Sequence, residues 1–247
     1  MDWAAYTDSF TNAIHERPTI QEWVHETARE ILVKQPKKVL EMGCGKGMIL
    51  FKVVGGASCV EEYVGCDLSR LAVKYVEQIF KSHVAPTLSQ KCRLSTHVRD
   101  ASNVAGLADQ SFDAVVCNGV SMYFPSAGYL VDVLRAGLPK LKRAGGIYHF
   151  GDVISLEHYK LFLLRRARFF THSFEEIQRP EIRESILASG KDRCYAQELF
   201  YALQLGDRLP GVAAVEVQLK HGAIMSEFNR CELLFNIRLI THRRPMS

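Results

Sequence analysis

A short apolar segment that runs directly into three glycines at alternate positions constrains this chain more than any other feature. Residues 38–42 are mostly apolar, Gly43, Gly45 and Gly47 follow, and residues 48–54 are apolar again. Glycines let a backbone turn sharply and come within contact distance of a ligand, where a side chain would block the approach. The pattern predicts a strand, a tight turn and a helix.

The alternation of strands and helices continues along most of the chain. Further strands are predicted at 62–66, 93–98, 112–117, 147–150, 213–219 and 231–240, and further helices at 20–33, 69–82 and 128–141. The strand at 112–117 is apolar on both faces, as suits the centre of a parallel sheet. We therefore expect an α/β fold, with a Rossmann-like sheet of seven mostly parallel strands, helices on both faces and an antiparallel final strand.

Residues 155–209 depart from this alternation, because they are mainly helical and more numerous than a crossover between strands requires. We expect them to form a helical cap beside the ligand crevice, inserted after the fifth strand. No internal repeat or linker-like change in composition is visible, so residues 1–247 are expected to form a single domain. Capping boxes are predicted where helices begin, at Thr19 to Glu22 and at Ser173 to Glu176.

The cap segment also carries an apolar stripe and a basic cluster. Leu161, Leu164 and Phe169 are expected to pack in a helix core, as such stripes usually do. The basic cluster is expected to be a solvated face; at the pocket entrance it would instead favour an anionic substrate. Its members are Arg165, Arg166 and Arg168.

Composition excludes several classes of protein. The 31 basic and 27 acidic residues nearly cancel, which gives no strong field for a polyanion, so no nucleic-acid partner is expected. No stretch is long and apolar enough to cross a bilayer and no secretory signal opens the chain, so no membrane partner and a cytoplasmic location are expected. The seven cysteines lack metal-ligand spacing, which favours buried reduced thiols and no metal.

Two acids lie beside the glycine turn at positions that suit a nucleoside-type ligand. Asp67 ends the second strand about 20 residues beyond the last glycine, where a carboxylate can accept both ribose hydroxyl protons. Glu41 stands two residues before the first glycine, which suits a cationic ligand such as a sulfonium with its amino-acid tail. A dinucleotide site would need a glycine where Met48 stands. An NAD site and a turn without a ligand are the alternatives.

The pattern E-x-G-x-G-x-G followed by a strand-end acid resembles the class I S-adenosylmethionine-dependent methyltransferases. The resemblance implies an enzyme that uses S-adenosylmethionine, leaves S-adenosylhomocysteine and holds the adenine amino group with Asp100. The alternative for Asp100 is a loop carboxylate that caps the chain from Ser102 onwards. The cofactor contacts expected are Glu41, Gly43, Cys44, Gly45, Gly47, Asp67, Leu68, Asp100, Ala101 and Asn118, together with Tyr6 and Phe10.

Longer stretches resemble the methyltransferase domains of nonribosomal peptide and polyketide synthases and their free-standing relatives. The similar stretches are 9–12, 22–24, 61–69, 118–126, 151–153 and 215–222. The chain departs from residues frequent in that family at Phe10, Met122 and Ile154, positions that can touch substrate. The family that methylates amino groups of nucleic-acid bases typically has an Asn-Pro-Pro-aromatic turn after the fourth strand, and this chain lacks it.

The resemblance implies N-methylation of a small amino-acid-derived or natural-product substrate, free or tethered to a carrier. Methylation of oxygen or carbon, and a cofactor-binding module without catalysis, are the alternatives. Because the chain begins with its own Met and shows no adenylation or carrier segment, we expect a released or different substrate. The pattern leaves open whether the protein is a monomer or a homodimer.

Three side chains near the carboxyl ends of the strands are catalytic candidates, because ligands bind there in open α/β sheets. Asp152 can take a proton or hold a substrate amine, or it can cap the following helix. Tyr123 is expected to line the pocket. His149 alternates with aromatic residues on a strand, so packing against the sheet is the alternative to catalysis. Much of the catalysis can come from alignment in a dry pocket.

Residues 1–19 are aromatic enough to fold over the cofactor as a lid that excludes water. The aromatic residues concerned are Trp3, Tyr6 and Phe10. Plain packing of this segment against the core is the alternative. Near the end of the chain, Glu227 and Arg230 are expected to pair on the surface rather than to reach the site.

Overall fold

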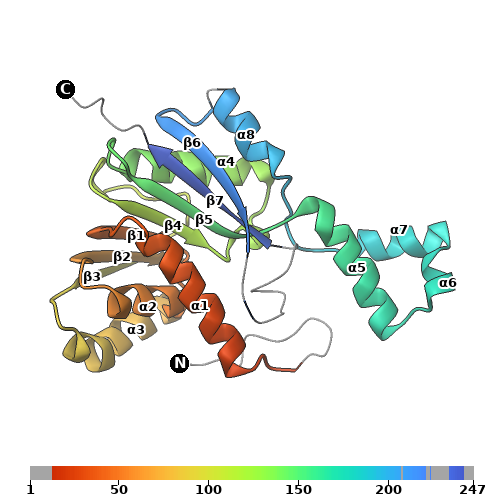
Figure 1. Ribbon diagram of the computed structural model, residues 1–247, viewed down its shortest axis with the longest axis horizontal. Helices are drawn as coiled ribbons and strands as arrows, with labels where there is room; N and C mark the ends of the chain where they lie inside the picture. The colour runs from red at the N-terminus through yellow and green to blue at the C-terminus, as the bar shows by residue number, and fades with distance from the viewer. Residues whose placement is uncertain (1–12, 207, 221–222, 224–233, 242–247) are drawn as a thin grey trace.

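A computed structural model describes residues 13–206, 208–220, 223 and 234–241, and its core is one seven-stranded sheet in the order β3-β2-β1-β4-β5-β7-β6 (Figure 1). All neighbouring strands pair parallel except β7, which runs antiparallel to β5 and β6. The predicted sheet is therefore confirmed. The strands are β1 (Lys38–Met42), β2 (Glu62–Asp67), β3 (Arg93–Val98), β4 (Ala114–Asn118), β5 (Ile147–Ile154), β6 (Val212–Leu219) and β7 (Leu234–Thr241).

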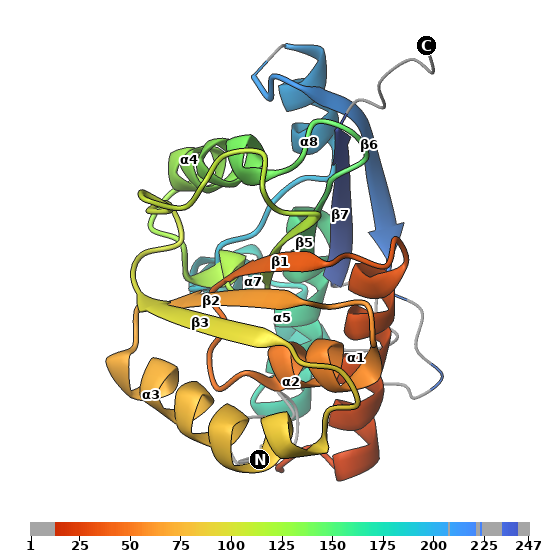
Figure 2. The ribbon, with the colours of Figure 1, turned by 90° about the vertical axis from the view of Figure 1, so that its left-hand side faces the viewer.

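Helices cover both faces of the sheet, as Figure 2 shows. One face carries α1 (Arg17–Leu32), α2 (Met48–Gly56) and α3 (Arg70–Ile79), and the other carries α4 (Ala127–Gly137) and α8 (Glu198–Leu205). Alternate residues of β4 serve the two cores: Ala114 and Val116 pack toward the first group, and Val115 and Cys117 toward the second. The strand predicted at 112–117 is apolar on both faces because helices bury both faces of β4.

The helical cap predicted after the fifth strand is present and extends away from the sheet (Figure 1). It comprises α5 (Leu156–Phe170), α6 (Phe174–Ile177) and α7 (Pro180–Ala188), with a small apolar core of its own. The predicted stripe is largely wrong, because α5 buries Tyr159 and Leu163, whereas Leu161 and Phe169 are exposed. The three arginines of α5 are exposed, in agreement with a solvated face.

One of the two predicted capping boxes is wrong. Ser173 and Glu176 form the reciprocal hydrogen bonds of a capping box at α6, as predicted. At α1 the helix begins at Arg17 with Glu16 at the N-cap, so Thr19 is already a buried helical residue. Pro18 explains the earlier start, because a proline in the first turn has no N–H left unpaired and a backbone angle suited to a helix.

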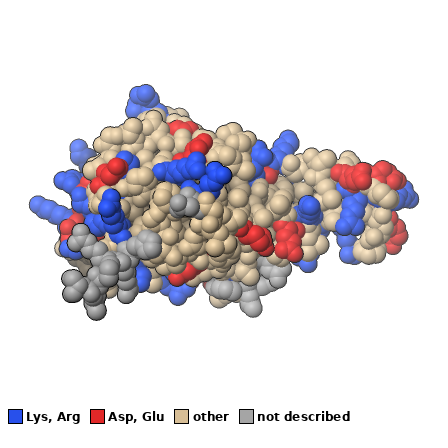
Figure 3. Space-filling model, turned by 90° about the horizontal axis from the view of Figure 1, so that it is seen from above, with Lys and Arg blue, Asp and Glu red and all other residues tan. Residues whose placement is uncertain are grey.

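Short π- and 3₁₀-helical turns, which the sequence pattern does not predict, complete the described secondary structure. A π-helical turn, Phe80–Val84, and a 3₁₀ turn, Ala85–Thr87, continue α3, and further 3₁₀ turns occupy Ser121–Tyr123 and Leu138–Lys140. None of the helices described combines the length and apolar character needed to cross a bilayer. On the face shown in Figure 3, the described acidic and basic side chains are interspersed.

Candidate functional site

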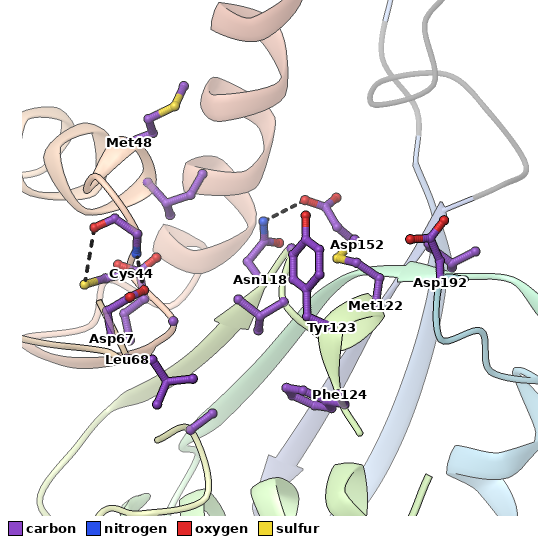
Figure 4. A pocket seen from close by; sticks show the side chains of 18 of the residues that line it. Cys44, Met48, Asp67, Leu68, Asn118, Met122, Tyr123, Phe124, Asp152 and Asp192 are labelled. Atoms are coloured by element: carbon purple, nitrogen blue, oxygen red, sulfur yellow. Dashed lines mark hydrogen bonds between the residues drawn. The ribbon is translucent and has the colours of Figure 1, made fainter. Parts of the chain in front are cut away.

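A pocket of about 740 Å³ opens at the carboxyl ends of the central strands (Figure 4). It lies where the strand order reverses between β1 and β4, which is the usual place for a ligand in an open α/β sheet. Its lining comes from the glycine turn after β1, the ends of β2, β3 and β4, the carboxyl-terminal part of β5, the first residue of β7, α1 and the cap. The pocket therefore has a glycine-turn half and a cap half.

The glycine turn has the backbone that the sequence predicts. Gly43, Gly45 and Gly47 all have positive φ, at 82°, 51° and 77°. A Cβ on Gly45 would meet no atom within 4 Å, so the space above it is open to a ligand. Gly47 is not among the lining residues; a Cβ there would lie 3.0 Å from Phe51 and Val76, so it serves the close packing of α2.

Asp67 ties the glycine turn to the end of β2. Its Oδ2 accepts the backbone N–H of Gly45 at 2.8 Å, and its Oδ1 accepts that of Ser69 at 2.8 Å. A carboxylate has about four acceptor sites, so the described residues leave two of those on Asp67 for a ligand. Leu68 beside it is 71% exposed and lines the pocket, so the described residues leave its apolar side chain open to a ligand.

Glu41 is a buried acid beneath the glycine turn. Its Oε2 accepts the hydroxyl of Tyr63 at 2.9 Å, and burial raises the pKa of its carboxyl to about 8. The carboxyl is therefore largely protonated at neutral pH in the protein alone. A cation entering the pocket would favour the ionised form, since an opposite charge at short range stabilises it.

Asp100 combines the two roles that the sequence left open. Its Oδ1 accepts the backbone N–H of Ser102 at 2.8 Å and the hydroxyls of Ser102 and Tyr129, so it does organise the following turn. Burial alone would raise the pKa of Asp100, but these hydrogen bonds lower it below its usual value. Asp100 and Ala101 also line the pocket. Among the described residues, no donor reaches Oδ2 of Asp100.

Asp152 is buried at the junction of the two halves of the pocket. Its Oδ2 accepts the indole N–H of Trp23 at 2.9 Å and the amide N–H of Asn118 at 2.7 Å (Figure 4), and its Oδ1 pairs with Nζ of Lys220. The alternative in which Asp152 caps α5 is wrong, because Ser155 occupies the N-cap.

The backbone at Asp152 is left-handed, with φ at 55°, where β5 and β7 shift register. Such a conformation costs about 1–3 kcal/mol in a residue other than glycine, although aspartate tolerates it better than most. The backbone N–H of Asp152 donates to Oδ1 of Asn236 at 2.9 Å, which anchors the bend to β7. The carboxylate of Asp152 is therefore held at the pocket by a backbone conformation that lowers the stability of the fold.

His149 lies behind Asn118 and does not line the pocket. Its ring is 1% exposed, with Nε2 at 3.4 Å from Oδ1 of Asn118 and Nδ1 at 3.7 Å from a carboxylate oxygen of Glu30. Burial lowers the pKa of His149 to about 4, so the ring is neutral at ordinary pH. This placement favours packing over direct contact with a substrate.

Tyr123 and the cap complete the lining. Tyr123 stands on the 3₁₀ turn after β4 and is 79% exposed, and Met122 lies next to it (Figure 4). From the cap, Tyr159, Phe162 and Asp192 reach the pocket. Sequence reasoning did not single out Trp23, Lys220, Asp192 or Tyr129 as site residues.

Several predicted residues fall outside the described part of the chain. They are Trp3, Tyr6, Phe10, Glu227 and Arg230. The lid predicted for residues 1–19 is covered by the structure only from residue 13 onwards. Within the described residues, no cluster of three or more histidine, cysteine or acidic side chains could hold a metal ion.

Known proteins resemble the chain in sequence. The family described as "Methyltransferase domain" matches residues 39–145. The nonribosomal peptide synthetase kk1B of Curvularia clavata is 37% identical over 169 residues, which cover 67% of this chain and 1% of that protein. The cyclosporin synthetase simA of Tolypocladium inflatum is 30% identical over 236 residues, covering 92% of this chain and 2% of that protein. The chain spans 5% or less of the length of such relatives.

Solved structures share the fold. The N-methyltransferase NodS of Bradyrhizobium japonicum WM9, in complex with S-adenosylhomocysteine, matches with a TM-score of 0.59 and 14% identity, over 92% of this chain and 89% of that one. The plantazolicin methyltransferase BpumL, also with S-adenosylhomocysteine, matches with a TM-score of 0.54 and 15% identity, over 90% and 82% of the two chains. At this identity the likeness concerns the fold.

Proposed function

The chain belongs to the class I S-adenosylmethionine-dependent methyltransferases, and from this premise we propose that it N-methylates a small amino-acid-derived substrate, either free or tethered to a carrier. The cofactor is S-adenosylmethionine, which when bound supplies an electrophilic methyl group on a sulfonium. The small-molecule substrate, nitrogen as the acceptor and an amino-acid-derived body are all part of the proposal.

The glycine-turn half of the pocket suits this cofactor. Open space above Gly45 allows close approach of a ligand to the backbone, and Asp67 has two free acceptor sites for ribose hydroxyls. Oδ2 of Asp100 is available for the adenine amino group. Glu41 would ionise against a positive charge, which suits the sulfonium and its amino-acid tail. We assign these four residues to cofactor binding.

Asp152 carries the proposal that nitrogen is the acceptor. An attacking neutral amine becomes positively charged as the methyl group transfers, and a fixed carboxylate stabilises a charge that develops at its own position. Trp23, Asn118 and Lys220 already occupy three of its acceptor sites and hold it rigidly, which leaves room for one substrate N–H. This arrangement orients and stabilises an amine.

Asp152→Asn is expected to lower kcat/KM for an amine substrate roughly 100-fold, because the amide keeps the shape but loses the charge that the transition state requires. The variant also leaves Lys220 buried without its anion, so the rate is measured at a temperature where circular dichroism shows the variant to be folded. The assay would use methyl-labelled cofactor with amino acids, aminoacyl amides and aminoacyl thioesters, and mass spectrometry would locate the label. Asp109→Asn is the matched control, since that carboxylate pairs with Lys140 away from the pocket.

Three outcomes would contradict the proposal. One is label on oxygen or carbon of the acceptor, the second is an unchanged rate in Asp152→Asn, and the third is cofactor binding without labelled product from any of these acceptors. The last would favour a non-catalytic binding module.

Asp67→Ala is expected to weaken binding of S-adenosylhomocysteine by about 1–3 kcal/mol, because the ribose would lose hydrogen bonds to a charged acceptor. Titration calorimetry measures the affinity directly. Ser69→Ala is the control, because it removes the side-chain cap of α3 but leaves the carboxylate in place. Equal affinity of Asp67→Ala and the native protein would refute the assignment of Asp67.

A further inference from the structure

The cap half of the pocket differs in chemistry from the glycine-turn half. Its side chains are almost all apolar or aromatic, whereas the other half presents carboxylates and backbone polar groups. The cap-side lining residues are Met122, Ile154, Tyr159, Phe162 and Leu234, with Asp192 as the acid among them. We infer that this half is a subsite for a large, uncharged apolar side chain of the methyl acceptor, and that Phe162 and Met122 set the size it accepts. The inference rests on the proposed function.

Three elements, β5, α5 and the distant β7, build the subsite. Ile154 and Leu234 face each other as register partners of β5 and β7, and both are 6% exposed. From α5, the rings of Tyr159 and Phe162 stack at 6.0 Å between centroids with 16° between their planes. The ends of two neighbouring strands and a pair of stacked rings therefore contribute to one apolar lining.

The aromatic side of the subsite is held in place. The hydroxyl of Tyr159 donates to Oδ2 of Asp192 at 2.8 Å, and the backbone N–H of Asp192 lies 3.4 Å from the same hydroxyl. Burial first, and the hydrogen bond to Asp192 second, raise the pKa of Tyr159 to about 12, so the phenol stays neutral. A fixed ring can discriminate size, since one methylene in an apolar pocket changes kcat/KM by roughly 10–200-fold.

The charges of the pocket exclude an acidic side chain from this half. Asp152 and Asp192 lie on or beside it, and the two basic residues of the described lining, Lys46 and Arg99, belong to the glycine turn and the end of β3. Among the described residues, an anion would meet these two carboxylates, and Lys220, which does not line the pocket, is already paired with Asp152. A long apolar side chain buries its surface there without that repulsion.

The cap half adjoins Asp152, and this identifies the side chain of the methyl acceptor as its occupant. Asp152 lies between the halves, so an acceptor whose amine contacts Asp152 can direct its side chain away from the cofactor and toward the cap. Met122 and Ile154, two of the three positions at which this chain departs from residues frequent in the family it resembles, both line this half. The subsite therefore sets which acceptor side chains this protein prefers.

A side-chain series of primary amides tests the subsite. The probes are glycinamide, alaninamide, leucinamide, phenylalaninamide and glutamic acid α-amide, and kcat/KM is measured for each. In the native protein, leucinamide or phenylalaninamide should exceed glycinamide at least roughly 10-fold, and the glutamate amide should be the poorest.

Substitutions then locate the preference. Phe162→Ala should lower the ratio of kcat/KM for phenylalaninamide to that for glycinamide at least roughly 10-fold, and Met122→Phe should shift the preference from phenylalaninamide toward alaninamide. Phe169→Ala is the control, because Phe169 lies on the same helix but is 60% exposed and outside the pocket. Equal kcat/KM across the series, or the same change in Phe169→Ala, would overturn the inference.

Equilibrium binding separates this inference from the proposed function. Each amide is titrated into the protein saturated with S-adenosylhomocysteine, where no transfer takes place. Tighter binding of leucinamide or phenylalaninamide with no N-methyl product would support the subsite and contradict N-methylation. If N-methyl product forms, but neither its rate nor the binding affinity depends on the side chain of the amide, the result would support N-methylation and contradict the subsite.

Discussion

Replacing Lys220 with methionine is expected to lower the free energy of unfolding by about 3–5 kcal/mol, because it leaves the Asp152 carboxylate buried without its cation. The two side chains are only 5% and 4% exposed, so water cannot take the place of the ammonium. Methionine keeps much of the length and the apolar contact of the stem, including its place near the ring of Trp23. The loss of stability in Lys220→Met therefore measures the loss of the ammonium charge and not the loss of packing. Urea unfolding followed by circular dichroism measures it.

Lys142→Met is the matched control for Lys220→Met. Lys142 also pairs with an aspartate, at 2.6 Å from Oδ1 of Asp113, but its side chain is 41% exposed. Removing an exposed partner costs at most about 1 kcal/mol, since solvent screens the charge that remains. Equal small losses in both variants would show that Asp152 does not depend on Lys220.

A double variant that removes both charges of the Asp152–Lys220 pair provides a second test. With Asp152→Asn added to Lys220→Met, no buried charge is left without a partner, and stability should recover in part relative to Lys220→Met alone. No recovery would mean that Lys220 acts through packing. The comparison isolates the electrostatic contribution of one ion pair.

The fold could be predicted from the sequence because the sequence patterns that determine its strands and helices are local. The glycine turn, the apolar runs and their spacing are read within about ten residues, and strands β1 and β3 begin and end where the pattern predicts. Asp67 was also predictable as a residue at the site, because the end of a strand next to the glycine turn lies at the crevice whatever the rest of the chain does.

The partners of Asp152 could not be predicted, because they come from distant parts of the chain. Trp23 stands 129 positions from Asp152 and Lys220 stands 68 positions from it. In the sequence, Trp23 is one apolar residue of an amphipathic helix, and Lys220 is a basic residue after a strand, where solvent exposure is the normal state. Only the crossing of α1, β5 and the end of β6 brings the three together.

The bend in β5 was missed for a related reason. The predicted strand ended at residue 150, since Gly151 and Asp152 are poor strand residues, whereas the observed strand continues to Ile154 through a register shift. Pairing with β7 sustains the strand, and such pairing leaves no mark in the sequence of β5 itself.

Gly151→Ala is expected to cost at least about 3 kcal/mol of stability and to abolish methyl transfer, because it adds a methyl group where the bend has no room. A Cβ on Gly151 would lie 1.9 Å from Oδ1 of Asn118 and 2.6 Å from Nε2 of His149. Neither side chain can yield freely, since Asn118 donates to Asp152 and both are buried.

Gly55→Ala supplies the comparison that makes this result specific. Gly55 lies in α2, and a Cβ there would meet no atom within 4 Å, so alanine should be neutral or stabilise the protein by up to about 1 kcal/mol. Denaturant unfolding and the labelled-methyl assay would be run on both variants. A stable, active Gly151→Ala would mean that Asn118 and Asp152 tolerate displacement. The rigid carboxylate on which N-methylation is proposed would then lose its physical basis.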